Sequence, residues 1–232
     1  MGESHQASRD AMVNNLKPGD LVTHYILDLI FRGKATPGDK LPSAENISKQ
    51  TGVSIISARE ALKNLEAIGL VKITHGKGIH VTEGGPILEE MLQARKMLEC
   101  HNAETAALKV CEKDLRNLRN LITDMDADLA ADDTRSFSER DHEFHMIIAR
   151  VSGNRFLLKA FENTKNILFY QQSLVNKYPG NPEISTRQHK EIVAALAKRD
   201  AVSARLFMSE HLDEALRILK KSIEILMRES EG

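Results

Sequence analysis

The 232-residue sequence lacks long apolar runs and contains two cysteines. No run of about 18 apolar residues is present, and the polar residues 1–15 contain no apolar signal core. We therefore expect neither membrane insertion nor export, and place the protein in the cytoplasm. Cys100 and Cys111 are about 16 Å apart along one predicted helix, which is too far for a disulfide bond. We expect both to be buried thiols.

The sequence also lacks a basic first segment. Residues 1–85 carry ten Lys and Arg against nine Asp and Glu, so this part of the chain is nearly neutral. Proteins that bind duplex DNA usually have a strongly basic surface. Any positive field here must come from local placement of Arg59, Lys63, Lys72 and Lys77, or from dimerisation, which doubles the phosphate contacts.

Composition divides the chain into two folded parts. Hydrophobic residues make up 41% of it, enough to fill real cores. A turn-rich stretch begins at residue 82, and nearly everything after residue 87 has helical periodicity. We expect a flexible N-terminus at residues 1–17, a first domain at 18–83, a linker at 84–86 and a second domain at 87–230.

Residues 37–81 have the pattern of two short helices followed by a β-hairpin. Ser43 and Ser54 can each cap a helix, and Gly52 permits a sharp turn between the two. The apolar residues 70–73 and 79–81 flank a glycine-containing turn and predict the hairpin. With an amphipathic helix at residues 20–31, this is a winged helix-turn-helix of three helices. DNA binding is our main interpretation, and a module that binds protein is the alternative.

The second domain is predicted to be all helical. Helical periodicity indicates helices at residues 87–111, 112–131, 134–152, 155–176, 182–199 and 201–228. The loops between them are short, so neighbouring helices should pack antiparallel as a bundle. The fold class is therefore mainly α.

Four residues of the second domain form a candidate metal site, which we call the Asp/His cluster: Asp141, His145, His189 and His211. Asp141 and His145 are four residues apart, which places them on one helix face. The other two lie on separate helices among apolar residues that would turn them inward. Such a donor set suits a divalent transition metal, with zinc first and manganese, iron or nickel also possible. With nine histidines in the chain, accidental spacing or a metal-free polar pocket is the alternative.

Several ordered motifs carry a family resemblance. In the first domain they are PGDKLPSAENIS, TGVS, REALKNLEAIGLV and HGKGIHV, and in the second ARKMLE, ETAAL, DHEFHMIIARVSGN, RQHKEIVAALAKRD and ARLFMSEHL. The chain resembles GntR-family transcriptional regulators of the FadR-like branch, which join a winged helix-turn-helix to an all-helical FCD ligand-sensing domain. The resemblance covers about residues 21–212.

The resemblance implies a role for each candidate residue of the second domain. The Asp/His cluster corresponds to the metal ligands of FCD domains, where the metal helps to hold a small carboxylate effector. Arg95 matches a position that faces this cavity and would pair with the carboxylate. The alternative is a helix-surface ion pair between Arg95 and Glu99. Asn154 and Arg187 are weaker candidates for effector binding.

The first domain departs from the family at two positions. Family members usually carry arginines where this chain has Glu45 and Ile55, and both arginines usually touch DNA. Isoleucine cannot make the bidentate hydrogen bonds of arginine, although it can contact a thymine methyl group. We therefore expect an atypical operator. The DNA-contacting residues that we predict are Ser54, Ser57, Arg59, Lys63, His75 and Lys77, although His75 has hairpin stabilisation as its alternative role.

Together these features predict a metabolite-responsive regulator of transcription without catalytic activity. We expect a homodimeric repressor that binds a pseudo-palindromic operator in double-stranded DNA. Its effector should be a small organic acid. A metal-dependent hydrolase with an attached winged-helix domain is the rival prediction, but no further carboxylate is clearly aimed at the cluster as a general base.

Overall fold

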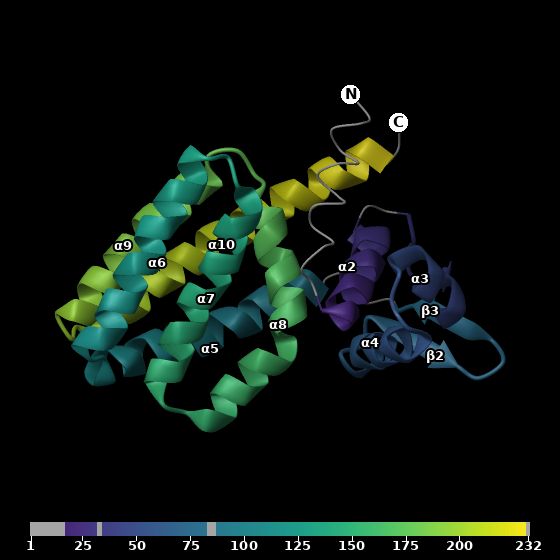
Figure 1. The fold of residues 1–232 in the computed structure, drawn as a ribbon, viewed down its shortest axis with the longest axis horizontal. Coiled ribbons are helices and arrows are strands. Elements are labelled where there is room, and N and C mark those ends of the chain that lie inside the picture. Colours follow the sequence, from purple (N-terminus) through teal and green to yellow (C-terminus); the bar gives the residue numbers. More distant parts are fainter. Residues whose placement is uncertain (1–16, 32–33, 83–86, 231–232) are drawn as a thin grey trace. The chain divides into compact units, whose positions relative to one another are not determined.

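The computed structural model describes residues 17–31, 34–82 and 87–230 (Figure 1). They form two compact units, which divide between Ile87 and Leu88, and residues from Ile223 onward group with the first unit. The expected linker at residues 84–86 and nearly all of the expected flexible N-terminus lie outside the described residues. Among the described helices, none combines the length and apolarity needed to cross a bilayer.

The first unit is a winged helix-turn-helix, as predicted. Its helices are α2 (Pro18–Phe31), α3 (Ala44–Thr51) and α4 (Ile55–Ala67), and its strands are β1 (Lys40–Leu41), β2 (Val71–Thr74) and β3 (Gly78–Val81). The helices pack on one another through buried Val22, Ile26, Ile47, Leu62 and Leu65. Burying these side chains is the main source of stability for such a small core.

Caps and turns place these elements where the sequence predicted. The side chain of Ser43 accepts a hydrogen bond from the backbone N–H of Asn46, and Ser54 accepts one from Ser57. Gly52 ends α3 with φ of 69°, a left-handed conformation that glycine adopts at little cost. Gly52 and Ser54 therefore build the turn between α3 and α4, whereas Ser43 caps the start of α3.

The sheet has one strand more than the predicted hairpin. Strand β3 lies between β1 and β2 and is antiparallel to both, with Leu41 and Ile73 on opposite sides of Ile79. Strand β1 is only two residues long. Such a short strand has no alternating pattern from which to predict it.

The second unit is built from helices, as predicted. They are α5 (Ile87–Lys109), α6 (Glu112–Ala130), α7 (Thr134–Ser152), α8 (Arg155–Asn176), α9 (Asn181–Ala197) and α10 (Ala201–Ser230), of which residues 201–222 belong to this unit. Helix α6 packs against α7 and α9, and α7 also packs against α8. The core between them contains Leu118, Met125, Phe137, Phe144, Ile192 and Met208.

The two cysteines differ in their surroundings. Cys100 is buried, whereas Cys111 is exposed, which corrects the expectation that both are buried. Cys111 lies at the N-cap of α6, where its backbone N–H donates to the carboxylate of Asp114 at 3.1 Å. A residue between two helices has no helix face to bury, so the periodicity of the helices could not place it.

Candidate metal centre and effector pocket

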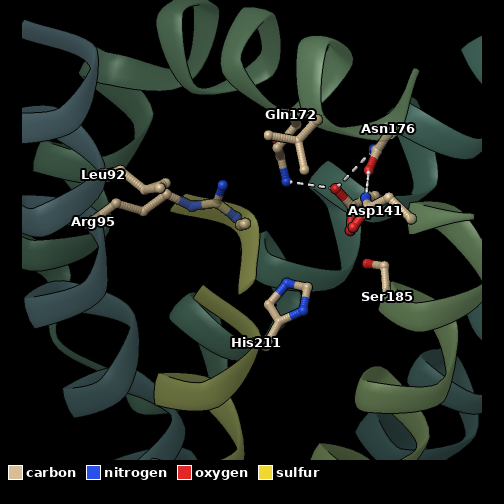
Figure 2. Close-up of a pocket in the computed structure, with 10 residues that line it drawn as sticks. Leu92, Arg95, Asp141, Gln172, Asn176, Ser185 and His211 are labelled. Atoms are coloured by element: carbon tan, nitrogen blue, oxygen red, sulfur yellow. Dashed lines mark hydrogen bonds between the residues drawn. The ribbon is translucent and has the colours of Figure 1, made fainter. Parts of the chain in front are cut away.

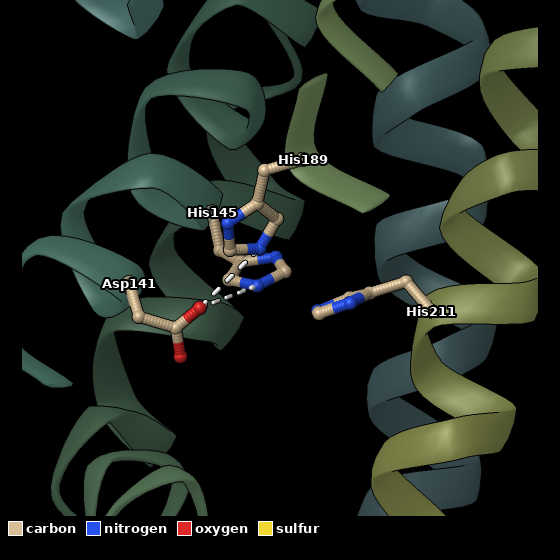
Figure 3. Close-up of side chains that lie close together, drawn as sticks. All are labelled: Asp141, His145, His189 and His211. Carbon is tan, nitrogen blue, oxygen red and sulfur yellow. Dashed lines mark ion pairs between the residues drawn. The ribbon is translucent and has the colours of Figure 1, made fainter. Parts of the chain in front are cut away.

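Three helices bring the Asp/His cluster together inside the second unit (Figure 3). Asp141 and His145 lie on successive turns of α7, His189 lies on α9 and His211 on α10. All four side chains are buried, and each offers a ligand atom within 4.8 Å of the others. The arrangement is the one that the helical spacing and the family resemblance predicted.

Aromatic packing fixes two imidazoles of the cluster. Phe144 is fully buried next to His145, and its ring stacks on His189 with the ring centroids 4.1 Å apart. Asp133 caps the N-terminus of α7 by accepting a hydrogen bond from the N–H of Ser136. The helix that carries two members of the cluster is thus held at its start and along its buried face.

Several cluster atoms are buried without a hydrogen-bond partner. Oδ1 of Asp141 lies 3.3 Å from Nε2 of His189 and 3.7 Å from Nε2 of His145. None of these three atoms makes a hydrogen bond. Buried polar atoms without partners are costly, and a cation among them would satisfy several at once. The residues therefore fit a divalent metal ion.

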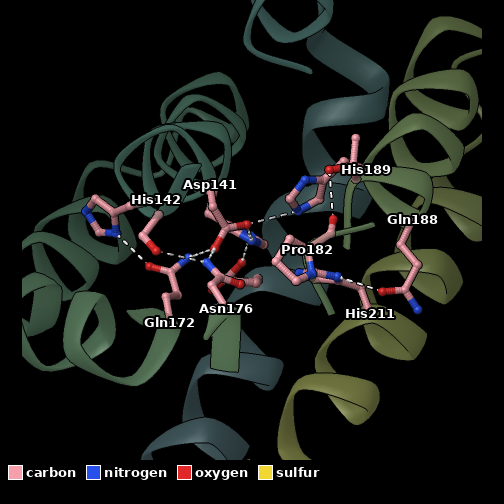
Figure 4. Close-up of polar contacts among 12 residues, drawn as sticks. Asp141, His142, Gln172, Asn176, Pro182, Gln188, His189 and His211 are labelled. Carbon is pink, nitrogen blue, oxygen red and sulfur yellow. Dashed lines mark hydrogen bonds and ion pairs between the residues drawn. The ribbon is translucent and has the colours of Figure 1, made fainter. Parts of the chain in front are cut away.

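Asp141 and His211 each have a second polar atom that forms hydrogen bonds with side chains outside the cluster (Figure 4). Oδ2 of Asp141 accepts hydrogen bonds from Gln172 at 2.9 Å and from Asn176 at 3.2 Å. Nδ1 of His211 lies 3.0 Å from Oε1 of Gln188, an oxygen that only accepts, so Nδ1 donates. Outer partners of this kind orient metal ligands and set the histidine tautomer.

Glu99 links the cluster to Arg95. Its carboxylate faces Nδ1 of His145 and also forms an ion pair with Arg95. Arg95 is 4% exposed and Glu99 2%, so the pair predicted for the helix surface exists but is buried. Burial raises the pKa of Glu99, but Arg95 and His145 outweigh it and hold the pKa at about 2. Glu99 is therefore ionised at neutral pH.

The protonation states of Asp141, His189 and His211 favour metal binding. Burial lowers the pKa of His189 to about 3, despite the nearby charge of Asp141. Burial and the neighbouring imidazoles hold the pKa of His211 well below its usual value. Burial alone would raise the pKa of Asp141, yet its contacts with the histidines lower it. A carboxylate and neutral imidazoles are the forms that bind metals.

His145 has the opposite pKa shift. Burial lowers its pKa, but the carboxylates of Glu99 and Asp141 together outweigh burial and raise the pKa above the usual value. Because Glu99 faces Nδ1, the proton is held on that nitrogen, and Nε2 remains directed toward Asp141.

A pocket opens beside Asp141 and His211 (Figure 2). It is a narrow pocket that is partly open to solvent. Its lining is Leu92, Arg95, Asp141, Gln172, Val175, Asn176, Asn181, Ser185, His211 and Ala215. The pocket thus combines one cation, several amide groups and an aliphatic wall, and two of the cluster residues form part of it.

Two predicted effector residues lie elsewhere. Asn154 is exposed at the N-cap of α8, where its side chain accepts hydrogen bonds from the N–H groups of Phe156 and Leu157. Arg187 is exposed on α9, and neither residue is among those that line the pocket. The structure assigns Asn154 a capping contact instead, which corrects its expected position at the pocket.

The predicted DNA-contacting residues lie on α4 and on the hairpin. Ser54 caps α4, and its hydroxyl lies 2.9 Å from that of Ser57. Arg59 and Lys63 are exposed on α4, and His75 and Lys77 are exposed in the turn between β2 and β3. These residues remain predictions as DNA contacts.

One contact of this surface was not anticipated. Nη2 of Arg59 donates to Oε1 of Glu45 at 2.8 Å, and both side chains are about half exposed or more. The ion pair joins α3 to α4 across the turn. Fourteen positions separate the two residues, so their spacing in the sequence does not predict the contact.

Sequence analysis also missed the outer partners of the cluster. Gln172 and Asn176 are one turn apart on α8, and Gln188 precedes His189 on α9. The spacing of Gln172 and Asn176 was a signal that both share one helix face. Glu99 was noticed only as a partner of Arg95.

Both units match known families. Residues 18–81 match the model described as bacterial regulatory proteins, gntR family, and residues 90–214 match the FCD domain. The Uxu operon transcriptional regulator of Escherichia coli (strain K12) is 32% identical over 226 residues, which cover 85% of this chain and 84% of that protein.

Two further comparisons agree with these matches. The HTH-type transcriptional regulator LutR of Bacillus subtilis (strain 168) is 27% identical, covering 84% of this chain and 98% of that protein. The solved structure of E. coli McbR/YncC has a TM-score of 0.66 at 21% identity, and the match covers 89% of this chain and 98% of that one. It shows that the two chains share a fold.

Proposed function

Because this chain belongs to the gntR family of bacterial regulatory proteins and carries an FCD domain, we propose that it is a DNA-binding regulator controlled by a small carboxylate. A homodimer of the chain binds a pseudo-palindromic operator and acts as a repressor. The relatives are named as transcriptional regulators and not as enzymes. The homodimer, the operator symmetry, repression, the carboxylate and the metal are all parts of this proposal.

One observation carries the proposal. The Asp/His cluster leaves ligand atoms buried and without hydrogen-bond partners, and the adjoining pocket contains the guanidinium of Arg95. A cation would be held by Asp141 and the three histidines of the cluster. Zinc is our first choice, with manganese, iron or nickel as alternatives. When bound, such an ion supplies a positive centre at which a carboxylate oxygen is stabilised.

Arg95 would bind the carboxylate from the other side. Its planar guanidinium offers paired N–H donors that match the two oxygens of a carboxylate. Arg95 also stays paired with Glu99, which neutralises its charge in the absence of ligand. The aliphatic side chains of Leu92, Val175 and Ala215 limit the pocket to a small molecule.

The affinity for the operator must differ between the effector-bound and the effector-free protein. A ligand shifts an equilibrium only if it binds the two arrangements of the protein with different affinities. By linkage, the operator would then change effector affinity by the same factor. Glu99 and Arg95 lie on α5, so changes at the pocket act directly on the first helix of the FCD domain.

Titration calorimetry on metal-loaded and chelator-treated protein tests the proposal. A panel of small mono- and dicarboxylates should contain a ligand that binds the loaded protein and weakens binding to an operator selected from random DNA. Removing the metal should reduce the affinity for that carboxylate by at least about tenfold, because a charge-assisted contact is lost. Undiminished affinity after metal removal would favour a metal-free polar pocket and overturn the role of the cluster.

A further inference from the structure

Helix α4 presents two apolar side chains to solvent at its start. Ile55 is 40% exposed and Ile56 is 78% exposed. The buried side of α4 contains Ala58, Leu62 and Leu65. Helical geometry places Ile56 opposite this side and Ile55 at its edge. Ile56 therefore contributes little to the core, whereas Ile55 is partly covered and exposes only part of its side chain.

Basic side chains share this surface of α4. Arg59 follows Ile55 by four residues and Ile56 by three, and Lys63 follows Ile56 by seven, so helical geometry places them on adjoining parts of one face. The side chain of Arg59 is 63% exposed, and Lys63 is also exposed. We call Ile55, Ile56, Arg59 and Lys63 the recognition face. Its charges suit a polyanion, and its apolar tip requires a partner that also has an apolar group.

The ion pair with Glu45 reduces what Arg59 offers to phosphates. The carboxylate lies 2.8 Å from the guanidinium, so the local charges cancel in part. Phosphate contacts supply affinity without sequence information, whereas base edges supply specificity. A recognition face with a partly neutralised arginine has to obtain more of its affinity from other contacts, such as those with base edges.

We propose that Ile55 and Ile56 recognise the C5 methyl groups of thymines in the major groove. The inference rests on the proposed function, in which the first unit binds duplex DNA through α4. The residues at the start of a recognition helix are the ones that contact base edges. Among the four bases, thymine alone presents a methyl group in the major groove, and apolar side chains contact it.

The recognition face fits DNA better than a protein partner. Besides Arg59 and Lys63, the exposed Lys77 in the turn between β2 and β3 adds positive charge to the same unit. Two isoleucines are also a small area for a stable protein contact, which usually buries about 800 Å² on each side. The exposed parts of the two isoleucines are large enough to contact one or two thymine methyl groups.

Deoxyuridine substitution tests the inference, because it removes only the methyl group. The full-length protein is first used to select duplexes from a random pool, and each enriched thymine is then replaced by deoxyuridine. At one or more positions the substitution should weaken binding by about fourfold, the effect of one buried carbon group. In the Ile55→Ala and Ile56→Ala variants, the same substitution should have little effect.

The controls separate this inference from the proposed function. Val202→Ala removes an apolar side chain of α10 that is about as exposed as Ile56, so it should leave the deoxyuridine effect unchanged. If the pool yields no enriched sequence, the proposed DNA binding fails, and this inference with it. If a sequence is enriched but deoxyuridine is tolerated throughout, or its effect persists in both variants, DNA binding stands and methyl recognition is overturned.

Discussion

The buried carboxylate of Glu99 faces Nδ1 of His145, on the side of the imidazole away from Asp141. The same carboxylate pairs with Arg95, which lines the pocket. Glu99 therefore orients His145, a candidate metal ligand, and balances the charge of Arg95, a candidate effector-binding residue. This double contact makes it the residue most suited to link the two sites.

Glu99→Gln should weaken metal binding. The amide keeps the size of the side chain but loses the charge that holds a proton on Nδ1 of His145. Changes to such outer partners typically cost 10- to 100-fold in metal affinity, and we expect a loss of about that size for zinc in competition with a chelator. Glu104→Gln is the matched control, because Glu104 pairs with Arg205 at the surface of the same helix. Equal zinc affinity in the two variants would contradict the role of Glu99.

Arg95→Gln should abolish most carboxylate binding while Arg187→Gln has no effect. Arg95 lines the pocket, whereas Arg187 is exposed on α9 outside it. Loss of a charge-assisted pair from a buried site costs about 1.5 to 3 kcal/mol, or roughly 10- to 150-fold in affinity. Calorimetry with the carboxylate found for the unmodified protein measures both variants. A larger loss of carboxylate affinity in Arg187→Gln than in Arg95→Gln would instead support Arg187 as an effector-binding residue.

Asn154→Ala should lower stability and leave effector binding unchanged. Its side chain accepts two N–H groups at the start of α8, and removing such a cap costs about 1 kcal/mol. The thermal midpoint of unfolding measures the loss. Asn120→Ala, in the exposed interior of α6, is the control and should be neutral or slightly stabilising, since alanine favours helices. A weakened carboxylate titration in Asn154→Ala would place this residue in the pocket after all.

Glu45→Gln should strengthen non-specific DNA binding more than Glu60→Gln does. Both changes remove one negative charge near α4, but only the first releases Arg59 from its ion pair. A released arginine gains a phosphate contact, which steepens the slope of log affinity against log salt concentration by about 0.9. Fluorescence anisotropy with a random-sequence duplex at several salt concentrations measures the slope. Identical slopes for the two variants would show that the pair does not restrain Arg59.

The helices and the cluster were predictable because their signals are local. Apolar spacing predicted the helices to within a few residues, and a spacing of four placed Asp141 and His145 on one face. The convergence of His189 and His211 on them was predicted from inward-facing apolar neighbours and from the family resemblance. Signals of this kind depend on helix geometry alone.

Contacts between distant elements were not predictable in the same way. The ion pair of Arg59 with Glu45 crosses the turn between two helices, and the hydrogen bond from Gln172 to Asp141 joins α8 to α7. Asn154 was misplaced because an asparagine after a glycine serves equally as a cap or as a pocket residue. Only tertiary packing decides between such roles.

The most direct test of the account is the metal content of protein purified without an affinity tag. Elemental analysis after zinc loading and gel filtration should find about one metal ion per chain, as a site with these ligands requires. His189→Ala should lose it, whereas His101→Ala, at an exposed position of α5, should retain it. If the unmodified protein retains no metal, or if His189→Ala retains as much as His101→Ala, the cluster is not a metal site.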